Sequence, residues 1–200
     1  MQGRRHLATV AGAALAGLLA LSGATAQDGA ATAKVGQPAP DFSLESTEGK
    51  SHKLSEHKGK VVVLEWFNPD CPAVKTHHAK NKTMRDTAKR FAGKDVVWLA
   101  INSGAEGKQG AGVERNQRAI REYEIPYPVL LDPKGTVGRA YGARVTPHLV
   151  VIDAKGNVAY VGAVDNGNSR AVGDENHVAA AVDALLAGEA PKVAETRPYG

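Results

Sequence analysis

Hydrophobic residues in this chain occur in short continuous runs and in stretches with helical spacing, which predicts alternating strands and helices. The clearest run is Lys-Val-Val-Val-Leu-Glu-Trp-Phe at 60–67, whose β-branched and aromatic residues are typical of a strand covered on both faces. A second run of this kind covers 95–101. The other predicted strands are an extended or edge segment at 35–44, a short strand at 127–131, and a hairpin of 147–152 and 157–161.

Helical patterns fill the intervals between these strands. A helix is predicted from Pro72 to about Phe91, because proline suits the first helical turn. Shorter helices are predicted over 136–141 and 176–187. A charged amphipathic helix is predicted over 113–124, with an inner face of Val113, Ala119, Ile120 and Tyr123. Alternating strands and helices that finish in a hairpin and a helix predict one α/β domain with a mixed sheet.

The N-terminal residues differ from the rest of the chain. Arg4 and Arg5 precede an uncharged, mostly apolar stretch that leads to Ala24-Thr25-Ala26, where small residues stand at the positions that a signal peptidase accepts. We therefore expect export to the periplasm or beyond, with no stable membrane association after cleavage; a permanent anchor is the alternative, although the stretch is short for a span. The predicted division is a signal peptide at 1–26, a flexible leader at 27–34 and a folded domain at 35–200.

Composition narrows the classes of function. The 200 residues include one cysteine, Cys71, which excludes an intrachain disulfide framework and a cysteine-built zinc or iron–sulfur site within this sequence. The net charge of +4 falls to +2 without residues 1–26, because two arginines and no acid are removed. No basic run is interleaved with aromatic residues, so we expect no nucleic-acid partner.

The lone cysteine stands where a reactive thiol is expected. Cys71 lies between the strand of 60–67 and the helix that begins at Pro72, so unpaired helix N–H groups favour its thiolate form. Lys75, one turn further, adds a positive charge. The alternative is a structural role, since free cysteine is among the most buried residue types.

Two other positions near the predicted strand ends are candidate site residues. Glu65 interrupts an apolar strand six residues before Cys71, where a carboxylate is costly unless it is paired or serves chemistry. Either it lies beneath the cysteine and passes protons to or from it, or it points to an exposed edge or pairs with a lysine. Thr146-Pro147 precedes a predicted strand, and from spacing alone Pro147 is a turn proline for which a cis bond is an option.

Two weaker patterns give no cofactor. His77 and His78 follow Cys71 on the predicted helix and His148 follows Pro147, so copper binding by a cysteine and histidines is a hypothesis. A solvated histidine on a surface helix is the more common role, and we expect no metal and no other cofactor. The glycines of 104–112 fit neither the dinucleotide fingerprint nor the P-loop, which predicts a flexible loop.

Four segments form a specific signal when they are taken together. They are Val-Gly-Gln-Pro-Ala-Pro-Asp-Phe at 35–42, Glu-Trp-Phe-Asn-Pro-Asp-Cys-Pro-Ala-Val at 65–74, Ala-Tyr-Gly-Ala-Arg-Val-Thr-Pro at 140–147 and Val-Ile-Asp-Ala-Lys-Gly at 151–156. In this combination the chain resembles thioredoxin-fold proteins. It resembles in particular the exported redoxin or peroxiredoxin-like group related to alkyl hydroperoxide reductase and thiol-specific antioxidant proteins. The resemblance covers about 35–200 and implies a thioredoxin-like α/β fold with a mixed central β-sheet flanked by helices.

The resemblance implies a role for each matching residue. Cys71 matches the attacking cysteine of the thioredoxin Cys-x-x-Cys motif, and Glu65 matches the buried acid six residues before it. Pro147 matches the cis-proline that faces the active site, and Thr146 the residue whose backbone binds a thiol substrate. The remaining expected substrate contacts are Trp66, Pro72 and Lys75.

Departures from the family pattern constrain the mechanism. Val74 occupies the place of the second cysteine, so the usual dithiol cannot close. Asn68 and Leu64 replace the threonine and proline of the peroxiredoxin signature Pro-x-x-x-Thr-x-x-Cys, which disfavours peroxide activation. Many relatives carry a second cysteine just after a Thr-x-Pro-x-Gly segment. Here that segment is 196–200, so such a resolving thiol is either absent or cut off.

The expected function is an exported thiol-dependent oxidoreductase or antioxidant protein that uses Cys71 alone. Its thiolate would attack a disulfide or a peroxide and give a mixed disulfide or a sulfenic acid. An external thiol, from a protein or a small-molecule reductant, must then release it; disulfide exchange is favoured over peroxide reduction. The alternative is a non-catalytic thioredoxin-fold module that binds a partner or carries a metal. The oligomeric state is not predicted.

Overall fold

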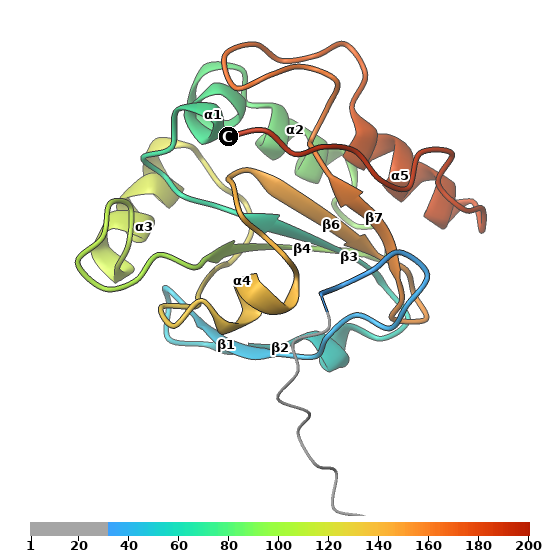
Figure 1. Ribbon diagram of the computed structural model, residues 1–200, viewed down its shortest axis with the longest axis horizontal. Helices are drawn as coiled ribbons and strands as arrows, with labels where there is room; N and C mark the ends of the chain where they lie inside the picture. The colour runs from blue at the N-terminus through green and yellow to red at the C-terminus, as the bar shows by residue number, and fades with distance from the viewer. Residues whose placement is uncertain (1–31) are drawn as a thin grey trace, which may run out of the picture.

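A mixed seven-stranded sheet forms the centre of the protein, whose computed structural model describes residues 32–200 (Figure 1). The strands are β1 (Ser43–Ser46), β2 (Ser51–Lys53), β3 (Val61–Trp66), β4 (Val96–Asn102), β5 (Val129–Leu131), β6 (His148–Ile152) and β7 (Val158–Gly162). Their order across the sheet is β2-β1-β5-β4-β3-β6-β7. The β3, β4 and β5 strands run parallel, whereas β6 pairs antiparallel with both β3 and β7.

The central strand β3 supplies both faces of the core. All six of its residues are buried, as the continuous apolar run predicted. Val61 and Val63 belong to the core on one face, together with Phe67 just beyond the strand; we call this the first core. Val62 and Leu64 belong to the core on the opposite face, the second core. A side-chain period of two along a strand explains this division.

Helices cover the two faces unequally (Figure 1). The helical elements are η1 (Leu54–His57), α1 (Pro72–Lys75), the π-helical turn η2 (Thr76–Lys80), α2 (Thr83–Arg90), α3 (Val113–Glu122), α4 (Thr136–Ala140) and α5 (His177–Leu186). Met84 of α2, Ala119 of α3 and Val178 of α5 pack in the first core. Val137 of α4 packs in the second core. The fold is thioredoxin-like, with a mixed sheet flanked by helices as the sequence predicted.

Two helix predictions need correction. The helix predicted from Pro72 to about Phe91 is interrupted, because Lys82 adopts a left-handed conformation with φ of 56° that no α-helix accommodates. In α3, Val113 is 45% exposed and does not belong to the inner face. Fully buried Asn116 takes part in that face instead, since its amide satisfies backbone carbonyls there.

The predicted signal peptide, 1–26, lies outside the described residues, as does most of the predicted leader. The last leader residues already contact the domain, since the N–H of Ala33 donates to the carbonyl of Ala140 over 2.9 Å. Within 32–200, no helix combines the length and the apolar character needed to cross a membrane.

Candidate functional site

Cys71 occupies the N-cap of the helical segment formed by α1 and η2. Its backbone is extended, with φ of −68° and ψ of 129°, and Pro72 begins the helix directly after it. The Cys71 N–H donates to the carbonyl of Asn68 over 3.1 Å, and the N–H of Lys75 donates to the Cys71 carbonyl over 3.0 Å. The side chain is half-buried against the first core, so the sulfur has a fixed position but keeps some exposure to solvent.

The thiol faces the loop that precedes β6. Cys71 Sγ donates a hydrogen bond to the carbonyl oxygen of Thr146 over 3.0 Å, and the Thr146–Pro147 peptide bond is cis, as the resemblance implied. The sheet explains this long-range contact. Because β3 and β6 are antiparallel neighbours and Trp66 pairs with His148, the loop after β3 and the loop before β6 meet at one end of the sheet.

The loop of residues 104–112, here called the glycine-rich loop, supports the turn that carries Cys71. The Asn68 side chain accepts from the N–H of Asp70 over 2.9 Å and donates to the carbonyl of Gln109 over 3.2 Å. Gly110 has φ of +76°, and a Cβ there would collide with the Asn68 amide. The loop is therefore a structural support, which the sequence did not reveal because the contact joins segments about 40 residues apart.

An ion pair holds Asp70, the residue directly before Cys71 in the same turn. The guanidinium of Arg115, from α3, contacts the carboxylate of Asp70 at 2.8 Å. This hydrogen bond is the main reason why the pKa of Asp70 lies below its ordinary value, and Lys75 contributes to the same effect. The turn before Cys71 is thus tied to α3 as well as to the glycine-rich loop.

Glu65 lies at the centre of a buried polar network. Its carboxylate is fully buried, 2.6 Å from His78 Nε2, and accepts from the Tyr127 hydroxyl over 2.8 Å and from the Trp98 indole over 3.4 Å. Burial, and secondarily the Glu65 charge, raises the pKa of Tyr127. An exposed edge or a lysine partner for Glu65 is therefore wrong, because the partner is a histidine. Among residues 32–200, no hydrogen bond joins Glu65 to Cys71.

The predicted substrate contacts divide into two groups. Pro72 is exposed and Lys75 is half-buried, and both flank Cys71. Trp66 is 2% exposed and belongs to the second core, and its indole donates to Ser103 Oγ over 3.2 Å. Successive residues of β3 point to opposite faces, so the fold places the Trp66 side chain away from the core against which Cys71 packs.

The three histidines of the metal hypothesis do not converge with Cys71. His77 and His78 are fully buried, so the expectation of solvated histidines on a surface helix is wrong. His148 is 5% exposed, and its ring lies 5.9 Å from that of Trp66. Burial lowers the pKa of His148 to about 4, so this side chain is neutral at pH 7. In the described part of the chain, no cluster of three or more His, Cys, Asp or Glu side chains is arranged to hold a metal ion.

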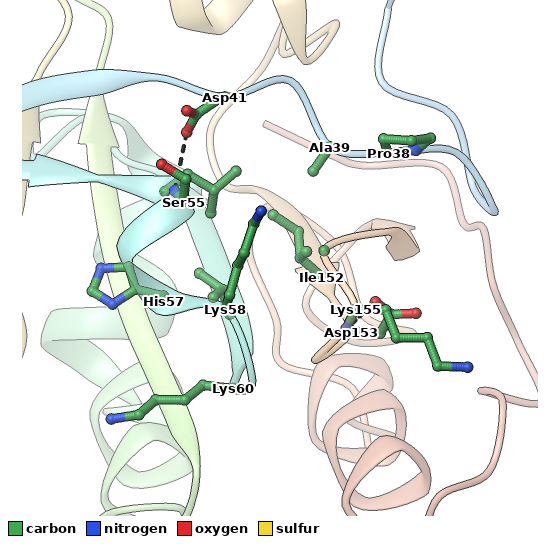
Figure 2. A pocket seen from close by; sticks show the side chains of 13 residues that line it. Pro38, Ala39, Asp41, Ser55, His57, Lys58, Lys60, Ile152, Asp153 and Lys155 are labelled. Carbon is green, nitrogen blue, oxygen red and sulfur yellow. Dashed lines mark hydrogen bonds between the residues drawn. The ribbon is translucent and has the colours of Figure 1, made fainter.

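A cavity of about 300 Å³ lies at the other end of the sheet (Figure 2). It is lined by Val62 at the start of β3 and Ile152 at the end of β6, whereas Cys71 follows the end of β3. Figure 2 shows the Lys60 and Lys155 side chains pointing away from one another. The residues that line the cavity include none of the Cys71 site.

Two curated proteins are similar to this chain over part of its length. The chain is 30% identical to the thiol-disulfide oxidoreductase ResA of Geobacillus thermodenitrificans over 124 residues, which are 62% of this chain and 66% of that protein. It is 29% identical to the peroxiredoxin Bcp of Bacillus subtilis over 110 residues, 55% of this chain and 64% of that protein. The matches thus span slightly less than two thirds of these curated relatives.

A solved structure and a family model cover more of the chain. The crystal structure of a hypothetical protein from Sinorhizobium meliloti 1021 superimposes with a TM-score of 0.75 at 25% identity, covering 84% of this chain and 92% of that one. The family model named Redoxin matches residues 34–182, which include Cys71, Glu65 and the Thr146–Pro147 loop. The chain therefore belongs to the redoxin family.

Proposed function

We propose that this protein is a thiol–disulfide oxidoreductase in which Cys71 is the nucleophile. The observation that carries the proposal is the position of the Cys71 thiol, half-buried at a helix N-terminus and in contact with the Thr146 carbonyl beside a cis-proline. The similarity to proteins named thiol-disulfide oxidoreductase supports the same reaction. When the thiol loses its proton it also loses the hydrogen bond to Thr146, so the sulfur becomes free to attack.

The proposed reaction proceeds by two exchanges. The Cys71 thiolate attacks one sulfur of a substrate disulfide, R–S–S–R′; the new S–S bond forms, the old one breaks, and R′–S⁻ leaves and takes up a proton. An external thiolate, R″–S⁻, then attacks the substrate sulfur of the mixed disulfide. This step forms R–S–S–R″ and releases Cys71 as a thiolate, so the chain itself is neither oxidised nor reduced overall.

Each neighbouring residue has a proposed role in this reaction. The backbone of Thr146 binds the substrate beside Pro147, and exposed Pro72 and half-buried Lys75 contact it from the helix. Glu65, whose fully buried carboxylate contacts His78 and Tyr127, exchanges a proton with Cys71 in the proposed reaction without a direct hydrogen bond to it within residues 32–200.

Disulfide exchange is favoured over peroxide reduction by the contacts of Asn68. This residue stands where the peroxiredoxin signature has a threonine, and its amide is engaged with Asp70 and Gln109. Asparagine has no hydroxyl, so this position cannot donate the hydroxyl hydrogen bond that a threonine would give to a peroxide bound at Cys71. We propose that the substrate is a disulfide of an exported protein, and that the reductant is an external protein or small-molecule thiol.

The proposal is tested by turnover of a protein disulfide with reduced glutathione as the external thiol. We expect turnover by the wild-type chain, none by Cys71→Ser, and slower consumption of hydrogen peroxide under the same conditions. Faster consumption of peroxide than of disulfide would assign the protein to peroxide reduction instead. Turnover of neither substrate would leave a binding module without catalytic activity.

A further inference from the structure

The residues Ala194–Gly200 cross the molecule from the β7 edge to the Cys71 site; we call them the strap. The N–H of Val161 donates to the Ala194 carbonyl, and the N–H of Thr196 donates to the Val161 carbonyl, each over 3.0 Å. The strap thus begins as a short parallel addition to the sheet edge. Figure 1 shows it running from the side of α5 to a point beside α1.

The first anchor of the strap is the Thr196 side chain. Its hydroxyl accepts from the N–H of Ala163 over 2.8 Å and lies 2.6 Å from the Tyr160 hydroxyl. Gly162 leaves the space that this contact needs, because a Cβ there would collide with the Thr196 backbone. This end of the strap is therefore built into the fold.

The second anchor is the Tyr199 hydroxyl, which we call the latch. It donates to the Asp165 carboxylate and lies 3.0 Å from His77 Nε2. Asp165 also accepts from the N–H groups of Gly167 and Gly173, so it remains hydrogen-bonded when the latch opens. His77 belongs to η2, which continues the helix that starts after Cys71, so the latch ties the strap to the segment that carries the thiol.

The far end of the strap lies on the Thr146 peptide group. A Cβ on Gly200 would collide with the backbone N, C and O atoms of Thr146. The same Thr146 oxygen accepts the hydrogen bond of the Cys71 thiol. The strap and the proposed disulfide substrate therefore compete for one stretch of backbone.

The strap is held by few contacts besides these. Glu195, Arg197 and Gly200 are exposed, and of the strap's side chains only that of Tyr199 packs against the first core, where it is partly buried. A segment with little buried apolar surface opens locally at a small cost in free energy. Opening beyond Thr196 requires loss of the latch and of the Gly200 contact, with no change in the sheet.

We propose that the strap is an autoinhibitory contact, which excludes extended polypeptide substrates from Thr146 and Cys71 when closed and admits them when the latch opens. The inference rests on the proposed function only for the identity of the substrate. Occupancy of the site by the strap can be measured without any turnover, because Cys71 is the single cysteine of the sequence and its alkylation reports access directly.

The test compares alkylation of Cys71 by iodoacetamide with alkylation by a maleimide attached to a folded carrier protein. In Tyr199→Phe the latch is lost and the ring is kept; in Gly200→Ala the added methyl pushes the strap end away from Thr146. Tyr141→Phe is the matched control, because it also loses one tyrosine hydrogen bond, to the Pro40 carbonyl, but does so in the second core.

We expect the ratio of bulky to small reagent rates to rise about tenfold or more in Tyr199→Phe, the factor expected for loss of one hydrogen bond to a carboxylate. Gly200→Ala should raise the ratio as well, and Tyr141→Phe should leave it unchanged. An unchanged ratio in both strap variants overturns the inference, as does an equal rise in all three variants. If the ratio rises but no variant turns over a disulfide, the strap stands and the proposed function fails.

Discussion

The burial of His148 makes a sharp prediction about the pH dependence of stability. Its side chain is 5% exposed, and within residues 32–200 neither ring nitrogen has a hydrogen-bond partner. Burial lowers its pKa from the ordinary 6.5 to about 4. Below pH 6.5 the unfolded chain therefore binds a proton that the native state does not bind until about pH 4, so stability is lost as the pH falls through this window. Between pH 7 and pH 4.5 the loss from this group is about 2.5 kcal/mol.

Urea denaturation of the wild-type chain and of His148→Phe, each at pH 7 and pH 4.5, measures this loss. Phenylalanine keeps a ring beside Trp66 and removes the titration. The carboxylates and the other histidines are common to both proteins, so their contributions to the pH dependence of the unfolding free energy cancel in the comparison. We expect the wild-type chain to lose about 2.5 kcal/mol more than the variant on acidification. Equal losses would refute the conclusion that His148 is buried in its neutral form.

Three other substitutions test the site and its support. Glu65→Gln should slow disulfide exchange about tenfold or more if the carboxylate exchanges a proton with Cys71; an unchanged rate in the glutathione turnover assay removes Glu65 from the mechanism. Asn116→Ala removes buried hydrogen bonds to Asn102 and to the carbonyls of Gly110 and Gly112. It should lower the free energy of unfolding, measured by urea denaturation, by about 2–3 kcal/mol. Val113→Ser, on the exposed side of the same helix, should change it by less than about 0.5 kcal/mol, and a larger loss would place Val113 in the core.

The main strands could be predicted because local pattern and final environment agree. The run at 61–67 is apolar without interruption except at Glu65, and β3 is buried on both faces. The β6–β7 hairpin follows from two short apolar runs separated by a tight turn. In contrast, the hairpin of β1 and β2 has mostly exposed residues, so its sequence lacks the apolar alternation that identifies a strand.

The contacts that complete the candidate site were harder to predict because they join distant segments. Spacing identified Cys71 as a thiol at a helix N-terminus, but the histidine partner of Glu65 depends on the turn η2 that follows α1. The support of Asn68 by the glycine-rich loop likewise depends on β4 lying beside β3. The same holds for the strap, since its latch joins residues 122 positions apart.

The proposed attack of the Cys71 thiolate on disulfides can be observed by trapping the mixed disulfide that it forms. The reduced chain is mixed with oxidised glutathione, the reaction is quenched with acid at intervals, and the mass of the protein is measured by mass spectrometry. We expect one glutathionyl adduct on Cys71, formed faster than on a short peptide with the sequence of residues 68–75 and removed by added thiol. Adduct formation no faster than on the peptide, or none at all, would contradict it.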